Sequence, residues 1–149
     1  MKETANMHQY LIDTNILIYH LAEEDAVELF FQTVNPLEDV LLYSFITRIE
    51  LLGFPDLTDS QTQKINLLLT QFEKVDMNKE IENITIQLRS KKKIKIPDAI
   101  IAASAFYTNS TLVTRNVDNF KNIDGLEICN PFVSPEFDKA IKDPPNDTC

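Results

Sequence analysis

The sequence predicts an α/β fold, and more specifically an α/β/α sandwich with a central parallel sheet. Short apolar runs of strand length alternate along the 149 residues with longer segments whose apolar residues recur at helical spacing. This alternation is typical of parallel strands joined by helices that cover both faces of the sheet. A chain of this length, with a hydrophobic fraction of 44%, can bury a core without a metal or a disulfide to hold it together.

Strands are predicted where a short apolar run ends at a cap or turn residue. The first run is Tyr10-Leu11-Ile12, and the Asp13-Thr14-Asn15 that follows has the composition of a helix start. The predicted strands cover residues 10–12, 40–44, 75–77, 111–113 and 126–129. In a parallel sheet the carboxyl ends of the strands share one edge, and the sites of this fold class lie there.

Helices are predicted between the strands from apolar periodicity and from residues that stop a helix. Thr47 and Glu50 have the spacing of a capping box and therefore indicate a helix start, whereas Asn35-Pro36 and Gly53 indicate helix ends. The predicted helices cover residues 16–22, 25–34, 47–53, 59–72, 81–93 and 97–105, with a turn or short helix at 118–122.

The chain is predicted to form one domain over residues 8–133, followed by a flexible polar tail at 134–149 that carries three prolines. A bridge between Cys129 and Cys149 is possible but is not expected in a reducing cytosol, and the two lack the paired spacing of a zinc site. The apolar runs are too short to span a membrane, and residues 1–7 lack the apolar core of a signal peptide. We therefore expect a cytoplasmic protein with no membrane partner.

Glycine content and charge exclude some functions and constrain others. Gly53 and Gly125 are the only glycines, so neither a dinucleotide-binding fingerprint nor a phosphate-binding P-loop is present. The formal net charge of −9 repels nucleic acid, so an RNA substrate requires a local positive patch.

Four acids follow predicted strand ends or open the helices behind them. Asp13 ends the first strand, Glu50 lies in the first turn of the helix after the second strand, Asp98 opens a later helix, and Asp118 follows the fourth strand. Each acid alone is explained by helix capping or by the helix dipole. Four carboxylates at one edge of a sheet, however, repel one another unless a cation binds, and hard oxygen ligands select Mg²⁺ or Mn²⁺.

The residues around these acids carry a family resemblance. Residues 11–17, 44–51 and 96–105, together with 112–116, Phe120 and 125–132, occur in the order and at the separations of the PIN-domain family. Within that family the chain resembles the VapC-type toxins of type II toxin–antitoxin pairs. The resemblance implies a parallel sheet flanked by helices and a Mg²⁺-dependent endoribonuclease inhibited by a cognate antitoxin. It also implies that the early helices meet the antitoxin and a second copy of the chain, as a homodimer.

The resemblance assigns Asp13, Glu50 and Asp98 as the metal-binding acids. The fourth position departs from the family pattern, because relatives often read Thr-x-Asn-x-x-Asp-Phe and this chain has Asp one residue earlier, in Thr114-Arg115-Asn116-Val117-Asp118-Asn119-Phe120. Either Asn116 or Asp118 is expected to serve. Asp13 and Asp98 would bind the metal directly, and Glu50 would ligate it or orient the attacking water as a base.

Second-sphere and substrate contacts are predicted from neighbouring residues. Thr14, Thr47 and Thr114 either hold the carboxylates or serve as helix caps and turn hydroxyls. The cations that precede Asp98 either lead RNA towards the metal or form a solvated helix end, and Arg115 is a second candidate for a phosphate contact. The predicted RNA-binding residues are Lys91, Lys92, Lys93, Lys95 and Arg115.

Other acid-based classes fit less well. A receiver domain needs adjacent acids after the first strand, and a haloacid-dehalogenase-type phosphatase needs Asp-x-Asp, but Asp13 is followed by Thr14 and Asn15. The alternative that stays open is a catalytically inactive PIN-like module that binds RNA or a protein, because the fourth acid is displaced.

Overall fold

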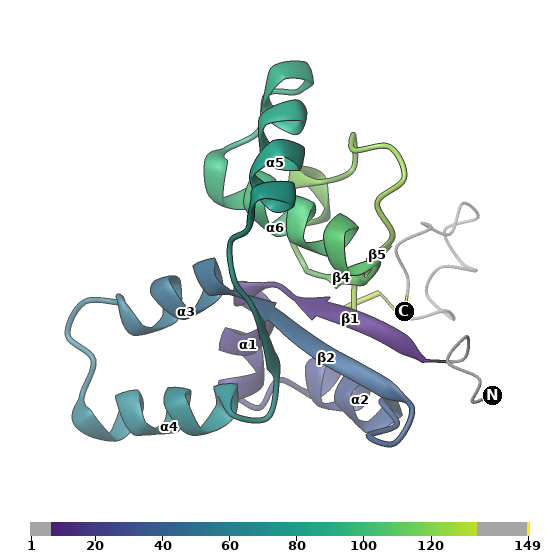
Figure 1. Cartoon of the computed structure of the whole chain (residues 1–149). Coiled ribbons are helices and arrows are strands. Elements are labelled where there is room, and N and C mark those ends of the chain that lie inside the picture. Colours follow the sequence, from purple (N-terminus) through teal and green to yellow (C-terminus); the bar gives the residue numbers. More distant parts are fainter. Residues whose placement is uncertain (1–6, 134–148) are drawn as a thin grey trace.

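The computed structural model describes residues 7–133 and 149. Five parallel strands form one sheet in the order β3-β2-β1-β4-β5, with helices on both faces (Figure 1). The strands are β1 (His8–Ile12), β2 (Asp39–Ser44), β3 (Glu73–Val75), β4 (Thr111–Val113) and β5 (Ile128–Cys129). The predicted α/β/α sandwich with a parallel sheet is therefore confirmed.

The helices fall into two layers. Figure 1 shows α1, α2, α3 and α4 on one side of the sheet and α5 and α6 on the other. The helices are α1 (Thr14–Leu21), α2 (Asp25–Thr33), α3 (Phe45–Leu52), α4 (Asp59–Leu69), α5 (Lys79–Lys91) and α6 (Ile96–Thr108), and a short 3₁₀ turn, η1, covers Val117–Asn119.

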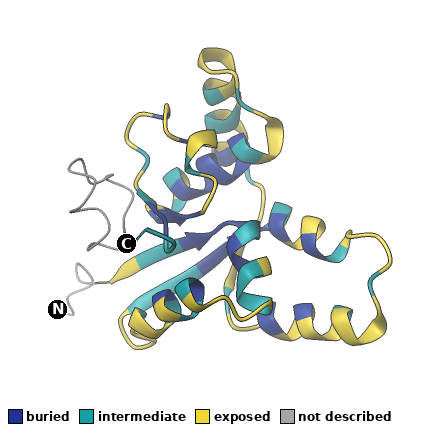
Figure 2. Ribbon diagram, turned by 180° about the vertical axis from the view of Figure 1, so that it is seen from behind, coloured by how far each residue is buried: buried dark blue, intermediate teal, exposed yellow. Residues whose placement is uncertain are grey.

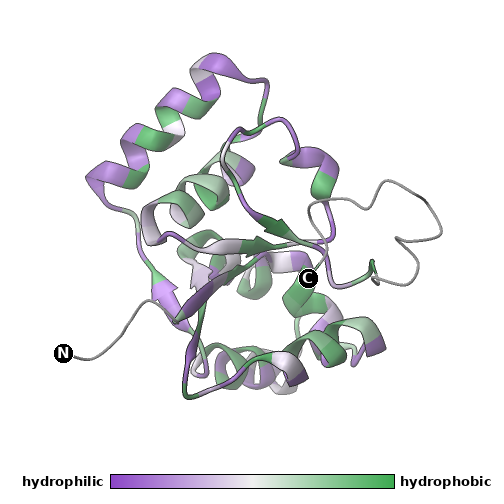
Figure 3. Ribbon diagram, turned by 90° about the vertical axis from the view of Figure 1, so that its right-hand side faces the viewer, coloured by the Kyte–Doolittle hydropathy of each residue, from purple (hydrophilic) through white to green (hydrophobic). Residues whose placement is uncertain are grey.

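The central strand β1 supplies both cores. Leu11 and Ile12 are fully buried, and because adjacent strand residues point to opposite faces, Leu11 belongs to the core under α5 and α6 while Ile12 belongs to the core under α1, α2 and α4. Buried residues run along the strands and the inward sides of the helices (Figure 2), and hydrophobic residues follow the same course (Figure 3). A strand buried on both faces must be a continuous apolar run, which is how β1 reads in the sequence.

The start of α3 differs from the sequence prediction. The helix α3 begins at Phe45 because the Ser44 hydroxyl caps it by accepting a hydrogen bond from the Ile46 amide, at 3.1 Å. The capping-box prediction for Thr47 and Glu50 is therefore wrong, and Glu50 lies in the second turn of the helix. A capping box does form one helix later, between Thr58 and Gln61.

Two further predictions shift by a few residues. The third strand covers 73–75 instead of 75–77, since its pairing with residues 42–44 of β2 ends at Val75. The helix α4 ends at Leu69, three residues early, and the Thr70 hydroxyl donates to the Leu67 carbonyl at 2.6 Å, which satisfies one of the last carbonyls of the helix.

The cysteines correct another expectation. Cys129 in β5 and Cys149 form a disulfide, with their Cα atoms 4.7 Å apart, a separation that disulfide geometry allows. The expectation of two free thiols is therefore wrong. The rest of the predicted flexible tail, residues 134–148, lies outside the described residues, so that prediction stands as made. Each helix within residues 7–133 is too short or too polar to cross a bilayer.

Candidate active site

Asp13 occupies the turn between β1 and α1 at the carboxyl edge of the sheet. Its backbone amide donates to the Val113 carbonyl of β4 at 2.9 Å, which fixes the end of the strand. The carboxylate is buried and accepts three hydrogen bonds: Oδ1 from the Thr14 amide at 2.8 Å, and Oδ2 from the Thr114 hydroxyl at 2.8 Å and from Asn15 Nδ2 at 3.0 Å. Asp13 is thus both the N-cap of α1 and an acid held in one orientation.

Asn15 is a site residue that the sequence analysis missed. Its amide nitrogen donates to the Asp13 carboxylate and approaches the Thr114 hydroxyl at 3.3 Å, while its Oδ1 accepts from the Arg115 amide at 3.2 Å. Asn15 therefore connects the first turn of α1 to the segment after β4. The Asp-x-Asn spacing was the available signal, because an amide two residues after a helix cap can turn back to that cap.

Glu50 is linked to α1 through Thr14. The Thr14 hydroxyl lies 2.5 Å from Glu50 Oε1 and 2.9 Å from the Thr47 hydroxyl. The geometry makes Thr14 the donor in both contacts, and because a hydroxyl has a single proton and the charged acceptor forms the shorter bond, Thr14 donates chiefly to Glu50, with Thr47 as the weaker acceptor. Thr47 is fully buried and Glu50 is exposed, so this chain of hydroxyls runs from the core to the carboxylate.

The three acids share one electrostatic environment. Burial raises the pKa of Asp13 to about 6, against the lowering effect of the Thr114 and Thr14 hydrogen bonds, and the negative charges of Asp98 and Glu50 raise it further. The pKa of Asp98 is also raised, first by burial and then by Glu50, while Lys95 lowers it. Neighbouring negative charges make ionisation of these acids unfavourable, and a bound cation would reduce that repulsion.

The carboxylate oxygens of the three acids fit a Mg²⁺ ion that keeps part of its water shell. Among residues 7–133 and 149, no three histidine, cysteine, aspartate or glutamate side chains converge as a ready-made metal cage. Mg²⁺, however, commonly keeps several waters and binds proteins through only one or two carboxylates. The lack of three converging ligands in the described residues therefore excludes a site made entirely of protein ligands there, but not a site of this kind. The hard oxygens of Asp13, Glu50 and Asp98 suit such a water-rich ion.

The two candidates for the fourth position connect to the site by different routes. Asp118 in η1 lines the same cavity as Asp98, and its exposed carboxylate pairs with Lys121 at 3.3 Å. Asn116 precedes η1, and its backbone amide donates to the Thr114 hydroxyl at 3.0 Å. Asp118 therefore shares a cavity with Asp98, and Asn116 is bonded to the hydroxyl that holds Asp13.

The predicted basic segment forms the end of α5 and the loop to α6. Lys92 is the C-cap of α5 and Lys95 is the N-cap of α6, and both line the cavity beside Asp98 together with Lys93. Lys91 does not line this cavity but a second hollow, between α5 and Phe106, which Lys92 also lines. The predicted group of four lysines is therefore divided, and three of them adjoin the acids.

Arg115 contacts aromatic rings. Its guanidinium lies 3.9 Å from the centre of the Phe132 ring and 5.1 Å from that of Tyr19, which are cation–π distances. The residue thus joins α1 to the segment after β5. A phosphate contact by Arg115, as predicted from the sequence, requires the side chain to leave or share these rings.

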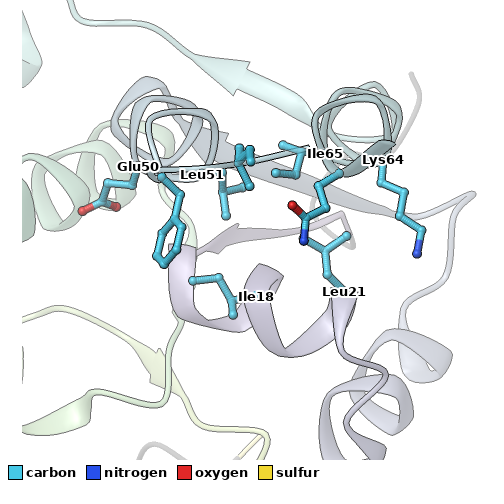
Figure 4. A pocket seen from close by; sticks show the side chains of 9 residues that line it. Ile18, Leu21, Glu50, Leu51, Lys64 and Ile65 are labelled. Carbon is cyan, nitrogen blue, oxygen red and sulfur yellow. The ribbon is translucent and has the colours of Figure 1, made fainter. Parts of the chain in front are cut away.

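An apolar groove of about 330 Å³ lies between α1, α3 and α4, with Glu50 on its lining (Figure 4). Ile18 and Phe54 are 48% and 64% exposed there, although their neighbours Leu51 and Ile65 are buried. The early helices α1 and α2, which are expected to meet the antitoxin and a second copy, expose only part of their apolar residues: Ile16, Leu17 and Phe30 are buried, whereas Ile18 and Leu29 are strongly exposed.

In a parallel α/β sandwich the functional site lies at the carboxyl edge of the sheet, which is where Asp13 lies. Residues 10–126 match the model of the PIN domain, and the chain therefore belongs to the PIN-domain family. A search of curated protein sequences found no match.

The similar solved structures are toxin–antitoxin complexes. A chain of a toxin–antitoxin complex from Klebsiella pneumoniae is 29% identical, with a TM-score of 0.69, over 84% of this chain and 99% of that one. A chain of VapBC-1 from nontypeable Haemophilus influenzae is 27% identical, with a TM-score of 0.75 and the same coverages. A chain of DNA-bound VapBC2 from Rickettsia felis is 24% identical, with a TM-score of 0.74, over 82% and 98%, which shows the fold. The chain is thus a PIN domain related to VapC-type toxins, and this relationship supports a nuclease.

Proposed function

We propose that this chain is a Mg²⁺-dependent endoribonuclease and the toxin of a toxin–antitoxin pair, acting in the cytoplasm. The observation that carries the proposal is the Asp13 carboxylate, which three donors orient and whose pKa is raised chiefly by burial and further by the charges of Asp98 and Glu50. A buried acid with a perturbed pKa, held rigidly among other acids, is expected at a catalytic site. Membership of the PIN family supports phosphodiester hydrolysis as the chemistry.

Each acid has its own role in this proposal. Asp13 and Asp98 hold the metal, and Mn²⁺ is expected to replace Mg²⁺ because both prefer hard oxygen ligands. When bound, the ion supplies an activated water and offsets negative charge on the phosphate. Glu50 either adds a ligand or accepts the proton of the attacking water, and Thr14, which donates to Oε1, fixes which carboxylate oxygen is free.

We assign binding of the RNA substrate to the loop that joins α5 to α6. Lys92, Lys93 and Lys95 line the cavity that also contains Asp98, so positive charge lies beside the acids despite a net charge of −9. Phosphate contacts by lysines would supply much of the affinity and make binding depend on salt. Lys91 and Arg115 are the less favoured contacts, because one lies on another hollow and the other is stacked on aromatic rings.

We assign the binding site of the antitoxin to the apolar groove between α1, α3 and α4. An inhibitory segment placed there would bury Ile18 and Phe54 and pass Glu50, which offers it both apolar area and a route to the acids. Leu29 of α2 is also exposed, and we assign it to the contact with a second copy in the proposed homodimer.

The alternative is a PIN-like module that binds RNA or a protein without cutting. It is favoured by the displaced fourth acid and by the lack of a ready-made three-residue metal cage in the described part of the chain. Such a module would retain affinity for RNA in EDTA and in magnesium alike.

The deciding experiment is cleavage of total RNA by the purified chain with Mg²⁺, with Mn²⁺ and with EDTA, alongside Asp13→Asn. The matched control is Asp25→Asn, since Asp25 is an exposed acid at the start of α2. We expect cutting by the wild type and the control with either metal, and none in EDTA or by Asp13→Asn. Cutting that survives EDTA or Asp13→Asn would mean a contaminating nuclease, and no cutting in any sample would favour the binding module.

A further inference from the structure

A cavity of about 340 Å³ opens beside Asp98, between the loop that joins α5 to α6 and the segment that includes η1. Its volume is at the lower end of the range of small-ligand sites. The acids of the candidate active site adjoin it through Asp98. A group bound in this cavity would therefore lie next to the phosphate that is cut.

One rim of the cavity carries three lysines, and the same cavity is lined by the carboxylates of Asp98, whose pKa burial raises and Lys95 lowers, and of Asp118. Within the described residues, no acid lies at ion-pair distance from Lys92, Lys93 or Lys95. Arg89 holds the loop in place, because its guanidinium donates to the Ile94 carbonyl at 2.7 Å. The three ammonium groups thus extend from a fixed loop and are free to bind phosphate oxygens.

The opposite rim carries two free amides above an apolar floor. Asn119 and Asn122 are exposed, and neither side chain forms a hydrogen bond within the part of the chain that the structure describes. Each amide offers donors and an acceptor, which is the pattern that base edges require. Ile94 and Ile123 pack into the core under α6 and form a surface against which a flat base can lie.

We propose that this cavity is a subsite for one unpaired ribonucleotide adjacent to the scissile phosphate, with its phosphate on the lysines and its base edge on Asn119 and Asn122. The inference rests on the proposed function and deepens it, because it gives the nuclease a sequence preference and a single-stranded substrate. A duplex is excluded from the subsite, since its bases are stacked inward and a cavity of this size takes one splayed base.

The test uses a pool of single-stranded RNA with randomised sequence, cleaved by the wild type, by Asn122→Ala and by the double variant Lys92→Ala, Lys93→Ala. Sequencing of the cut ends gives the base preference at each position, and the rate gives total activity. Asn83→Ala and Lys79→Ala are matched controls, because both residues are exposed on α5 and line neither this cavity nor the groove. Thermal melting checks that each variant is folded.

We expect the wild type and both controls to prefer one base roughly tenfold at a position beside the cut, and Asn122→Ala to reduce that preference to about twofold or less. The lysine double variant should cut more slowly whatever the sequence. Each lost lysine should also make the dependence of RNA affinity on salt less steep, by about 0.7 in the slope of the logarithm of the binding constant against the logarithm of the salt concentration. An unchanged preference in Asn122→Ala, with the wild type cutting, would overturn the subsite and leave the nuclease standing.

A second readout separates the two proposals if the wild type does not cut. Binding of a fluorescent single-stranded RNA library is then measured by anisotropy, with a hairpin duplex for comparison. Weaker single-strand binding by Asn122→Ala and by the lysine double variant, relative to their controls, would support the subsite without the nuclease. Equal binding by all variants, or equal binding of single strand and duplex, would overturn it.

Discussion

The hydroxyl of Thr114, at the end of β4, donates to Asp13 Oδ2, at the end of β1, across 2.8 Å. The two residues are 101 positions apart in the sequence, and the parallel pairing of Ile12 with Val113 brings them together. Thr114 is fully buried and also accepts from the Asn116 amide at 3.0 Å, so one hydroxyl orients the central acid and the segment that follows β4. Catalytic geometry here depends on strand register.

Replacing Thr114 by Val should therefore lower the rate of RNA cleavage strongly and the stability of the fold only slightly. The variant keeps the shape of the side chain but removes the donor to Asp13, and loss of such a contact typically costs tenfold to a hundredfold in metal affinity or activity. The Mg²⁺ concentration that gives half-maximal cleavage should rise, while Thr114→Ser should restore most of the loss. Thr85→Val, on α5, is the control, since its hydroxyl bonds only to the Ile81 carbonyl. Equal Mg²⁺ curves for Thr114→Val and wild type would contradict this account.

The raised pKa of Asp13 predicts a pH-dependent cost in stability. The pKa moves from its ordinary 3.8 to about 6 in the folded chain, chiefly because of burial, so folding favours the protonated acid. The cost is absent below pH 4, grows as the pH rises through 4 to 6, and is complete above that, at about 3 kcal/mol or less.

Asp13→Asn should accordingly be more stable than the wild type at pH 8 in EDTA by about 1–3 kcal/mol, with the difference reduced towards zero at pH 4. The variant loses the one acceptor oxygen, Oδ2, that faces Thr114 and Asn15, and this cost does not depend on pH, so it lowers the difference at both pH values. Mg²⁺ should stabilise the wild type and not the variant. Urea unfolding at both pH values measures these differences, and a variant less stable than the wild type at pH 8 would show that the hydrogen bonds outweigh the buried charge.

The disulfide predicts a redox-dependent stability. A bridge that closes 20 residues is expected to contribute about 3 kcal/mol, so a reducing agent should lower the melting temperature of the wild type and leave Cys149→Ser unchanged. A thiol assay on the untreated, denatured chain should find no free thiol. Two free thiols per chain would contradict the bridge.

The apolar groove predicts a separation of inhibition from catalysis. Ile18→Glu places a charge among Leu51, Phe54 and Ile65, so the co-expressed cognate antitoxin should bind at least tenfold more weakly while RNA cleavage by the free toxin persists. Leu37→Glu is the control, because Leu37 is 92% exposed and lies outside the groove. Calorimetric titration with the antitoxin measures the difference, and unchanged affinity for Ile18→Glu would place the antitoxin elsewhere.

The fold was predictable because β1 and α6 carry strong local signals. A strand buried on both faces has to be a continuous apolar run, and Pro97 with the alanines that follow defines the helix start and its close packing. The start of α3 was mispredicted because Thr47-x-x-Glu50 matches a capping box, although Ser44, one turn earlier, supplies the cap. The pattern cannot indicate that a threonine at that spacing is buried against Thr14.

The candidate site was predictable as a set of residue types and less so as a set of contacts. Asp13, Glu50 and Asp98 influence one another as expected from strand ends. Asn15 was missed because its role depends on the Arg115 amide, which only the pairing of β1 with β4 brings near. The division of Lys91 from the other lysines likewise depends on where α5 ends, and element boundaries are the least certain part of any sequence pattern.

The most direct test of the central claim is Mn²⁺ binding, measured by electron paramagnetic resonance on the wild type, Asp13→Asn, Asp98→Asn and the control Asp25→Asn. If Asp13 and Asp98 hold the metal, the wild type and Asp25→Asn should take up Mn²⁺ in the same way, Mg²⁺ should displace it, and the other two variants should bind at least tenfold more weakly. Equal Mn²⁺ uptake by all four folded proteins would contradict a metal centre at this edge of the sheet.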